Sequence, residues 1–379
     1  MMPQSIAPSY VTFLRDWDFR VVALFDNWRS LNYVKNLNGI GTYSFSMGSR
    51  DPRVDLFKLD YFVDVHRAVP GCGISRYSEF IGFHRKGVYS VDSGGDQIFV
   101  SSGMSLEEIL KGAIINFPEA TIRSYKFCSS NRAILEYVRE NCGDLATVAE
   151  ERYSNGVVPN FEIDPVTEYG PTWEGDRAFE NLLDVLVEIS KFSGIDFSVE
   201  FDEASSKLRF HTYTGGLGKN RTYTDVNPLT GNNSYGEFPF TFSLEKGTIS
   251  SISYEDDHSS EANVVSVLGD GDASTRHVQV RESPNKDLSP YNRREVSRPQ
   301  GGFENEMQVF GDGILEELKY KQNITIKPLM SPSSMYHSNF GLGDWISIYF
   351  KSQIFNRRIV SVTNSVDSYE NISLTLALS

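Results

Sequence analysis

Residues 38–46 read Asn-Gly-Ile-Gly-Thr-Tyr-Ser-Phe-Ser, a turn followed by a run in which apolar and polar side chains alternate. The alternation continues to Met47, and a shorter one precedes the turn at Leu31 and Tyr33. Two alternating runs joined by an Asn/Gly turn are typical of a β-hairpin with one buried face. The sequence therefore predicts a pair of strands here, within a β-rich region.

Further short strands are expected on both sides of this hairpin. Runs of β-branched and aromatic residues, bounded by turn residues, occur at 21–25, 61–65, 79–84 and 97–100. A composition with 25 Phe, 19 Tyr and 30 Gly also favours β structure. Several short strands joined by tight turns predict that residues 1–104 form a small β-barrel or sandwich.

The hydrophobic period changes to that of helices after residue 104. Residues 130–141 and 176–193 carry apolar side chains at helical spacing. For the second of these helices, Asp176 is the expected N-cap and Gly194 the expected end. A strand pair follows that helix, so we expect an α+β domain, residues 105–238, to be inserted into the β structure.

Two long polar segments rich in turn residues, 215–238 and 282–304, are expected to contact another subunit or a partner protein. Between and after them the apolar pattern of strands returns. We expect residues 239–261 to complete the first β domain and residues 262–379 to form a second β domain. The predicted fold class is α+β, mainly β, with two β-barrel domains and one inserted α+β domain.

The net charge of −14 argues against a general nucleic-acid coat, because binding to phosphates needs a basic surface. No run of about 20 apolar residues indicates a transmembrane helix, and the first residues lack the basic and apolar regions of a signal peptide. We therefore expect no membrane insertion by this chain. The three cysteines share no metal-ligand spacing and are interpreted as free thiols in a reducing compartment: Cys72, Cys128 and Cys142.

Three short stretches carry residues that could do chemistry, and each departs from the motif that it resembles. Residues 215–220 are Gly-rich but lack the spacing of a phosphate loop. Asp270 and Asp272 begin like a calcium loop, which would need a Glu at its twelfth position, where Arg281 stands. Residues 255–258, Glu-Asp-Asp-His, alternate sides in an extended chain and cannot all converge on one ion. We therefore predict no catalytic site, no cofactor and no metal site.

Several segments, taken in order, resemble those of phage tail hub proteins. These are the siphovirus tail proteins that follow the distal tail protein and, more distantly, the hubs of contractile baseplates. The matching features are the hairpin opening, a strand with an aromatic residue and a glycine before its turn, a glycine-then-helix step, and a Leu-Gly-Asp turn into a late strand. The segments are residues 38–46, 79–85, 103–110, 263–269, 340–346, 359–362 and 372–376.

The resemblance implies a homotrimeric structural protein of the virion tail, assembled in the host cytoplasm. Each subunit of such a hub has two tube-like β domains, so three subunits present a pseudo-hexameric ring. The ring joins the six-fold tail tube or distal tail ring to a three-fold tip, and it lines the channel through which DNA passes. The implied partners are the distal tail or tube protein ring, tail-tip, spike or fibre proteins, and the tape-measure protein, with DNA met only in transit.

Two other functions stay open. A β-rich carbohydrate- or receptor-binding tail module would use Tyr and Trp as platforms for sugars, although aromatic residues in alternating strands mostly lie in the core. A tail-associated hydrolase would need converging acids, or a nucleophile and a base, in one cleft. A ring stacked on a tube protein would distinguish the hub from both.

Overall fold

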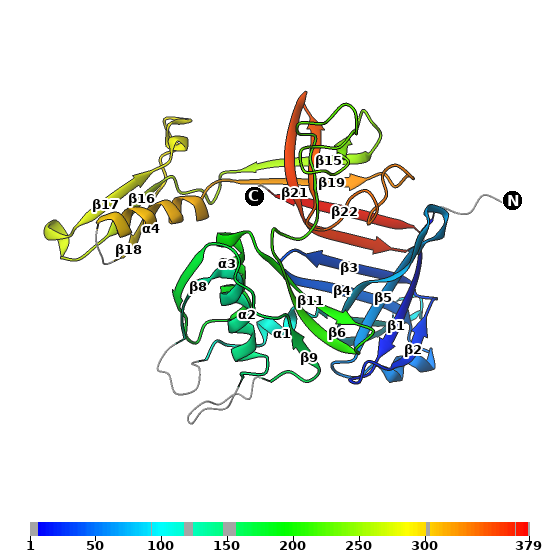
Figure 1. Ribbon diagram of the computed structural model, residues 1–379. Helices are drawn as coiled ribbons and strands as arrows, with labels where there is room; N and C mark the ends of the chain where they lie inside the picture. Colours follow the sequence, from blue (N-terminus) through cyan, green and yellow to red (C-terminus); the bar gives the residue numbers. More distant parts are fainter. Residues whose placement is uncertain are drawn as a thin grey trace. The chain divides into compact units, whose positions relative to one another are not determined.

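The expected hairpin at residues 38–46 is present in the computed structural model, where β3 (Ser30–Asn36) and β4 (Gly39–Gly48) pair antiparallel (Figure 1). Tyr33 lies opposite Tyr43 and Leu31 opposite Phe45, and all four side chains are buried. Asn38 in the turn has a φ of 53°, in the left-handed region that asparagine tolerates. The structure describes residues 7–91, 93–116, 124–146, 157–300, 304–367 and 369–377.

The other strands of the N-terminal region extend this hairpin on one side. They follow the order β4-β7-β6-β5-β1-β2, and a short 3-10 helix (Pro52–Leu56) covers part of their core. Half of the buried residues in this core are aromatic, because many inward positions of the alternating strands carry Phe or Tyr. The strands are β1 (Ser9–Arg15), β2 (Val21–Phe25), β5 (Phe62–Val69), β6 (Ile74–Val91) and β7 (Gln97–Ser105).

Strands from the C-terminal third continue the same sheet on the other side of the hairpin. β3 pairs antiparallel with β21, which gives the strand order β15-β19-β22-β21-β3-β4-β7-β6-β5-β1-β2. Within the described residues this order is an open path rather than a closed ring of strands. The predicted class, α+β and mainly β, is confirmed. The added strands are β15 (Ile249–Asp257), β19 (Lys321–Pro328), β20 (Trp345–Phe350), β21 (Gln353–Val366) and β22 (Glu370–Ala377).

The strands of residues 239–261 do not join the N-terminal strands, which corrects the expectation stated above. β14 (Thr241–Ser243) runs parallel to β20, as does the short β13 (Asn220–Arg221), and β15 lies next to β19. The physical reason is aromatic packing. The rings of Phe240 and Phe242 lie 5.4 and 5.0 Å, centroid to centroid, from the ring of Phe340.

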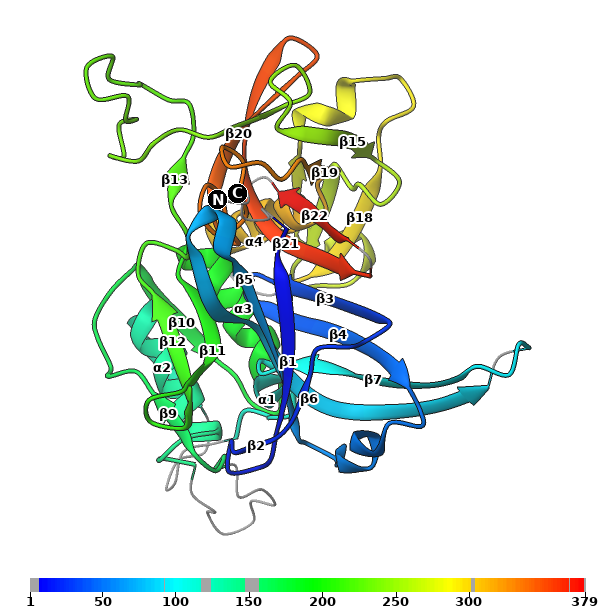
Figure 2. The same ribbon diagram turned by 90° about the vertical axis from the view of Figure 1, so that its right-hand side faces the viewer.

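The inserted α+β region lies beside β1 to β7 and is coloured cyan to green in Figure 2. α2 has the predicted bounds, whereas α3 begins at Leu182, because the side chain of Asn181 accepts from the Leu183 N–H at 3.1 Å and caps the helix there. Asp176 instead ends β10. Gly194, with a φ of 71°, ends α3 as expected. The elements are α1 (Glu108–Lys111), β8 (Tyr125–Ser129), α2 (Ser130–Asn141), β9 (Phe161–Ile163), β10 (Thr172–Asp176), α3 (Leu182–Ser193), β11 (Asp196–Asp202) and β12 (Lys207–Tyr213).

The chain divides into two compact units. Unit 1 contains the described residues up to Ser251 together with Ile326–Ala377, and unit 2 is Ile252–Thr325. In unit 2, α4 packs on a three-stranded sheet through Val265, Val267 and Met307. Its elements are β16 (Val264–Leu268), β17 (Val278–Glu282), β18 (Glu295–Pro299) and α4 (Glu304–Glu317).

The segment 282–304, expected to contact another subunit or a partner protein, contains β18, which pairs parallel with β16. Residues 301–303 of that segment lie outside the described residues. The predicted domain boundaries at residues 104, 238 and 261 stay predictions.

Among the described residues, no helix combines the length and the apolar character needed to cross a bilayer.

Candidate functional site

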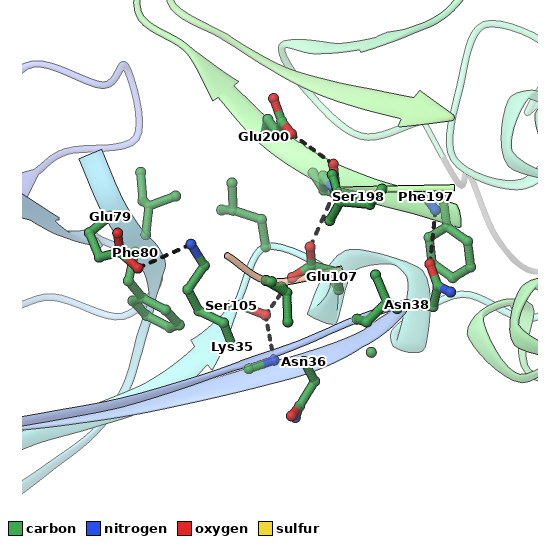
Figure 3. Close-up of a pocket in the computed structure, with 18 of the residues that line it drawn as sticks. Lys35, Asn36, Asn38, Glu79, Phe80, Ser105, Glu107, Phe197, Ser198 and Glu200 are labelled. Carbon is green, nitrogen blue, oxygen red and sulfur yellow. Dashed lines mark hydrogen bonds and ion pairs between the residues drawn. The ribbon is translucent and has the colours of Figure 1, made fainter. Parts of the chain in front are cut away.

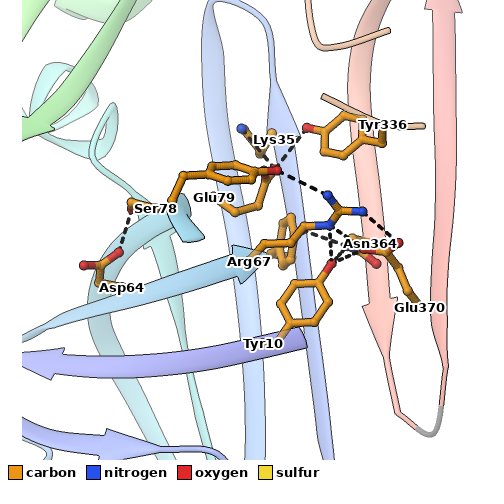
Figure 4. Close-up of polar contacts among 11 residues, drawn as sticks. Tyr10, Lys35, Asp64, Arg67, Ser78, Glu79, Tyr336, Asn364 and Glu370 are labelled. Carbon is orange, nitrogen blue, oxygen red and sulfur yellow. Dashed lines mark hydrogen bonds and ion pairs between the residues drawn. The ribbon is translucent and has the colours of Figure 1, made fainter. Parts of the chain in front are cut away.

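A buried ion pair lies where the N-terminal and C-terminal strands of unit 1 meet. Arg67 on β5 donates from Nε to Glu370 Oε1 at 2.7 Å, and from Nη2 to Oε2 at 3.0 Å (Figure 4). Both side chains are almost completely buried. Burial opposes the charge, but the hydrogen bond with Glu370 and its charge raise the pKa of Arg67 above its usual value. The two-pronged geometry holds β5 and β22 at a fixed distance and angle.

Hydroxyl and amide groups surround this ion pair. The Tyr10 hydroxyl contacts Glu370, and Arg67 Nε lies 3.1 Å from it. Asn364 on β21 donates to the hydroxyls of Tyr10 and Tyr33, each at 2.7 Å. Burial, followed by the charge of Glu370, raises the pKa of Tyr10 well above its usual value, so this hydroxyl stays protonated.

A second buried carboxylate, Glu79 on β6, extends the network. Its Oε1 accepts from Lys35 Nζ at 3.2 Å and from the Tyr336 hydroxyl at 3.0 Å. The Arg67 guanidinium lies 5.5 Å from the centroid of the Tyr336 ring, and this contact connects the groups around Glu79 with those around Glu370. We call these residues the joint cluster: Tyr10, Tyr33, Lys35, Arg67, Glu79, Tyr336, Asn364 and Glu370.

The inserted region is attached close to this joint through Asp196, the first residue of β11. Asn38 Nδ2 and the Leu217 N–H donate to its carboxylate at 2.6 and 2.5 Å, and Arg358 of β21 forms an ion pair with it. Asp196 is buried. One carboxylate therefore fixes the inserted region to the β3–β4 turn and to β21 at once.

The Gly-rich stretch at 215–220 is used for close packing. Gly218 has a φ of 86°, and a Cβ there would lie 2.4 Å from the carbonyl carbon of Gly343. Arg358 Nη2 donates to the Leu217 carbonyl at 2.8 Å. The glycines let two backbones approach each other. The N–H groups of Leu217 and Lys219 in this stretch donate to carboxylates of this chain, Asp196 and Asp344, rather than to a phosphate.

A pocket of about 470 Å³ lies among the β3–β4 hairpin, β6 and β11 (Figure 3). Glu107 in this pocket accepts from the Ser105 hydroxyl and from the Val199 N–H, the latter at 3.3 Å. Burial raises the pKa of Glu107. Since Ser105 also accepts from the Gly41 N–H at 2.7 Å, these polar groups bond to one another and brace the pocket wall.

The other residues considered for chemistry have local partners of their own. Asp272 forms a capping box with Thr275 around a short 3-10 helix (Ala273–Thr275), and His258 Nδ1 lies 2.6 Å from Glu261 Oε2. No group of three or more His, Cys, Asp or Glu in the described part of the chain is arranged to hold a metal ion. The cysteines are free thiols: Cys72, Cys128 and Cys142.

The sequence reasoning did not find the residues of the joint cluster. Partners within the cluster lie as far as 360 positions apart in the chain, as Tyr10 and Glu370 do. The one local signal is a charged residue inside an apolar strand, as Arg67 is in Phe62–Val69.

This fold is that of phage tail proteins. It is similar to the 43 kDa tail protein of prophage MuSo2 from Shewanella oneidensis, with a TM-score of 0.60 and 10% identity over 98% of each chain. A tail protein from Neisseria meningitidis MC58 matches with a TM-score of 0.56 and 10% identity, over 98% of this chain and 97% of that one. A Francisella PdpA-VgrG complex matches with a TM-score of 0.55 and 10% identity, over 100% of this chain and 53% of that one.

The chain belongs to the family of Siphovirus ReqiPepy6 Gp37-like proteins, which matches residues 11–376. The expected relationship to siphovirus tail proteins is therefore confirmed. No curated protein matches the sequence. Family and fold together put the chain among phage tail structural proteins.

Proposed function

We propose that this chain is the subunit of a trimeric tail hub, which joins the tail tube or distal tail ring to the tail tip. The observation that carries the proposal is the strand order. The series β15-β19-β22-β21 continues directly into β3-β4-β7-β6 through the β3–β21 pair. Each subunit thus has an N-terminal half and a C-terminal half side by side in one sheet, the arrangement that a pseudo-hexameric ring of three copies requires.

The joint cluster supports this function physically. A subunit that adapts six-fold to three-fold symmetry must hold its two halves at one fixed angle. Arg67 and Glu370 connect strands of the two halves, and neither charge can leave its partner inside the protein without a large desolvation cost. The network therefore favours one relative orientation of the two halves.

The acidic composition suits a channel. With a net charge of −14, the protein has little tendency to bind the DNA backbone, so DNA could slide past it without being retained. We propose that DNA is met only in transit and that the role is structural rather than enzymatic. The polar groups of the pocket support this, because Ser105 and Glu107 are bonded to each other and to neighbouring backbone.

The long loop 215–238 is proposed to contact a partner protein. Its turn is built on the buried Asn233, whose side chain donates to the carbonyls of Asn220 and Thr222 at 2.8 and 3.0 Å. This ordered base presents Leu229, which is 93% exposed, and Phe238, which is 69% exposed. Exposed apolar side chains on an ordered loop are typical of a protein–protein contact. We propose that a neighbour in the tail, such as a tail-tip or distal tail protein, buries them.

Imaging of intact phage particles tests the proposal. We expect three copies of this chain in one ring around the channel, between the tube and the tip, within the virion tail. Six copies in one ring, or copies only at the tail periphery, would contradict the hub and favour a receptor-binding module.

A further inference from the structure

The second half of β6 has a strand edge without a partner. β6 runs from Ile74 to Val91, but its pairing with β5 ends at Phe83, opposite Phe62. Its other edge stays paired with β7 as far as Val91, opposite Gln97. From Arg85 to Val91, therefore, the outer edge faces no other strand among the described residues, and Figure 2 shows this hairpin projecting from the sheet.

This hairpin carries apolar side chains on both of its faces. Tyr89 and Val91 point to one face and are 62% and 66% exposed, while Val88, also exposed, points to the other. An exposed strand edge with apolar residues on both faces is a template for pairing with another chain. A protein that remained a monomer would be prone to aggregate through this edge.

At the other end of the strand series, β15 has one partner strand among the residues that the structure describes, β19. The exposed side chains of β15 are the small Ser250, Ser251 and Ser253, followed by the acidic Glu255 and Asp256. In the described part of the chain, neither of these acids forms an ion pair, and neither does Lys86 of the β6 edge. The two edges are therefore complementary in charge as well as in hydrogen bonding.

We propose that β6 of one copy pairs, edge to edge and antiparallel, with β15 of the next copy in the ring. The inference rests on the proposed trimer and names the strands that close it. Antiparallel pairing puts Lys86 against Glu255 and Asp256, and Val88–Val91 along the serine-rich start of β15. Parallel pairing would instead put the apolar residues against the carboxylates.

Other edge contacts fit less well. A β6–β6 contact would be self-complementary and would stop at two copies, whereas a contact between two different edges closes a ring. The outer edge of β2 is blocked, because Arg53 Nη1 donates to the Leu24 carbonyl at 2.6 Å. A charged side chain placed there is a common protection against unwanted strand pairing.

Charge reversal with rescue tests the pairing. Lys86→Glu is expected to weaken trimer formation by about tenfold or more, because like charges then face each other across the contact. The double change Glu255→Lys and Asp256→Lys should have a similar effect, and combining all three changes should restore assembly. Lys246→Glu, an exposed change outside both edges, serves as the matched control, and circular dichroism verifies that each variant is folded.

Cysteine cross-linking in assembled tails gives a second readout. In a Cys72→Ser, Cys128→Ser background, a chain with Tyr89→Cys and Ser253→Cys should form a ladder of two and three linked chains. A chain with only one of the two introduced cysteines should stay unlinked, because the remaining Cys142 is buried. If imaging shows a three-fold ring, but neither the cross-linked ladder nor the charge-reversal rescue is observed, the β6–β15 contact is wrong and the proposed hub function still stands. Cross-linking of Tyr89→Cys alone would indicate a β6–β6 contact and overturn the inference, and the absence of a trimeric ring would overturn both proposals.

Discussion

Arg67 and Glu370 illustrate how single residues can fix an arrangement without adding much net stability. When two charges are buried, the loss of their hydration offsets most of their mutual attraction. A buried ion pair therefore adds little to folding stability compared with apolar residues of the same size. Removing one partner, however, costs about 3–5 kcal/mol, because the other charge stays buried alone. The pair therefore penalises every arrangement of β5 and β22 except the observed one.

Glu107 is expected to make stability depend on pH. Its folded-state pKa is raised by burial, so its ionisation opposes folding. Below the unfolded-state pKa, Glu107 is neutral in both states and its ionisation does not reduce the free energy of unfolding. As pH rises from there through the folded-state pKa, the side chain must ionise inside the protein, and that free energy falls. Glu107→Gln keeps an oxygen that accepts from the Val199 N–H and places an amide NH2 beside the Ser105 hydroxyl, without the charge. The variant should have a higher urea midpoint than the parent at about pH 7, and this advantage should shrink towards about pH 4.

The exposed Glu245 provides the control for this titration. Glu245→Gln should shift the urea midpoint little at either pH, because an exposed carboxylate keeps its hydration when the protein folds. An advantage of Glu107→Gln that is constant across the pH range would show that the charge is not its cause.

At the scale of elements, the β3–β4 turn does more than reverse the chain. Asn38 Nδ2 donates to Ser190 Oγ at 2.8 Å and to Asp196, and its Oδ1 accepts from the Phe197 N–H at 2.9 Å. The turn thus connects the end of α3 and the start of β11 to the β sheet. Sequence predicted the turn from its Asn-Gly pattern, but not this second role, because the partners lie more than 150 residues away.

Replacing Asn38 should separate the two roles of the turn. Asn38→Gly tolerates the positive φ but loses the three hydrogen bonds, so we expect a cost of about 2–4 kcal/mol in the free energy of unfolding. Asn38→Ala should cost about 1 kcal/mol more, because alanine is strained in the left-handed region. Urea unfolding measures both. Asn160→Gly, at an exposed position with the same φ of 53°, should change stability by only a few tenths of a kcal/mol.

The elements also show where sequence reasoning is sufficient. The bounds of β2 and α2 were predicted as observed, because each has a strong local period and clear ends. The start of α3 was missed because the cap at Asn181 competes with Asp176, and the choice depends on β10 pairing with β8. The strands of 239–261 were assigned to the wrong neighbours because their apolar residues pack against Phe340, which no local pattern reveals.

At the scale of the whole molecule, the fold class and the order of elements followed from composition, period and resemblance. The continuity of the sheet through β3 and β21 did not, since strand pairing across more than 300 residues leaves no trace in local sequence. The two compact units are not marked in the local sequence either. Unit 2 begins within the strand β15 and ends within β19, so no linker of distinct composition marks its borders.

Removal of unit 2 tests whether unit 1 folds on its own. The rings of His258 and Tyr320 are stacked at 4.6 Å, and the Ala262 N–H donates to the Leu318 carbonyl, so the chain enters and leaves unit 2 at nearly the same point. Replacing residues 259–319 by Asn-Gly should let β15 and β19 join as a hairpin. Among the described residues, the two largest hydrophobic clusters of unit 1 contain no residue of unit 2. We expect one cooperative thermal transition within about 5 °C of the parent's, measured by calorimetry. A protein that aggregates, or that loses its β circular dichroism, would show that unit 1 needs unit 2 to fold.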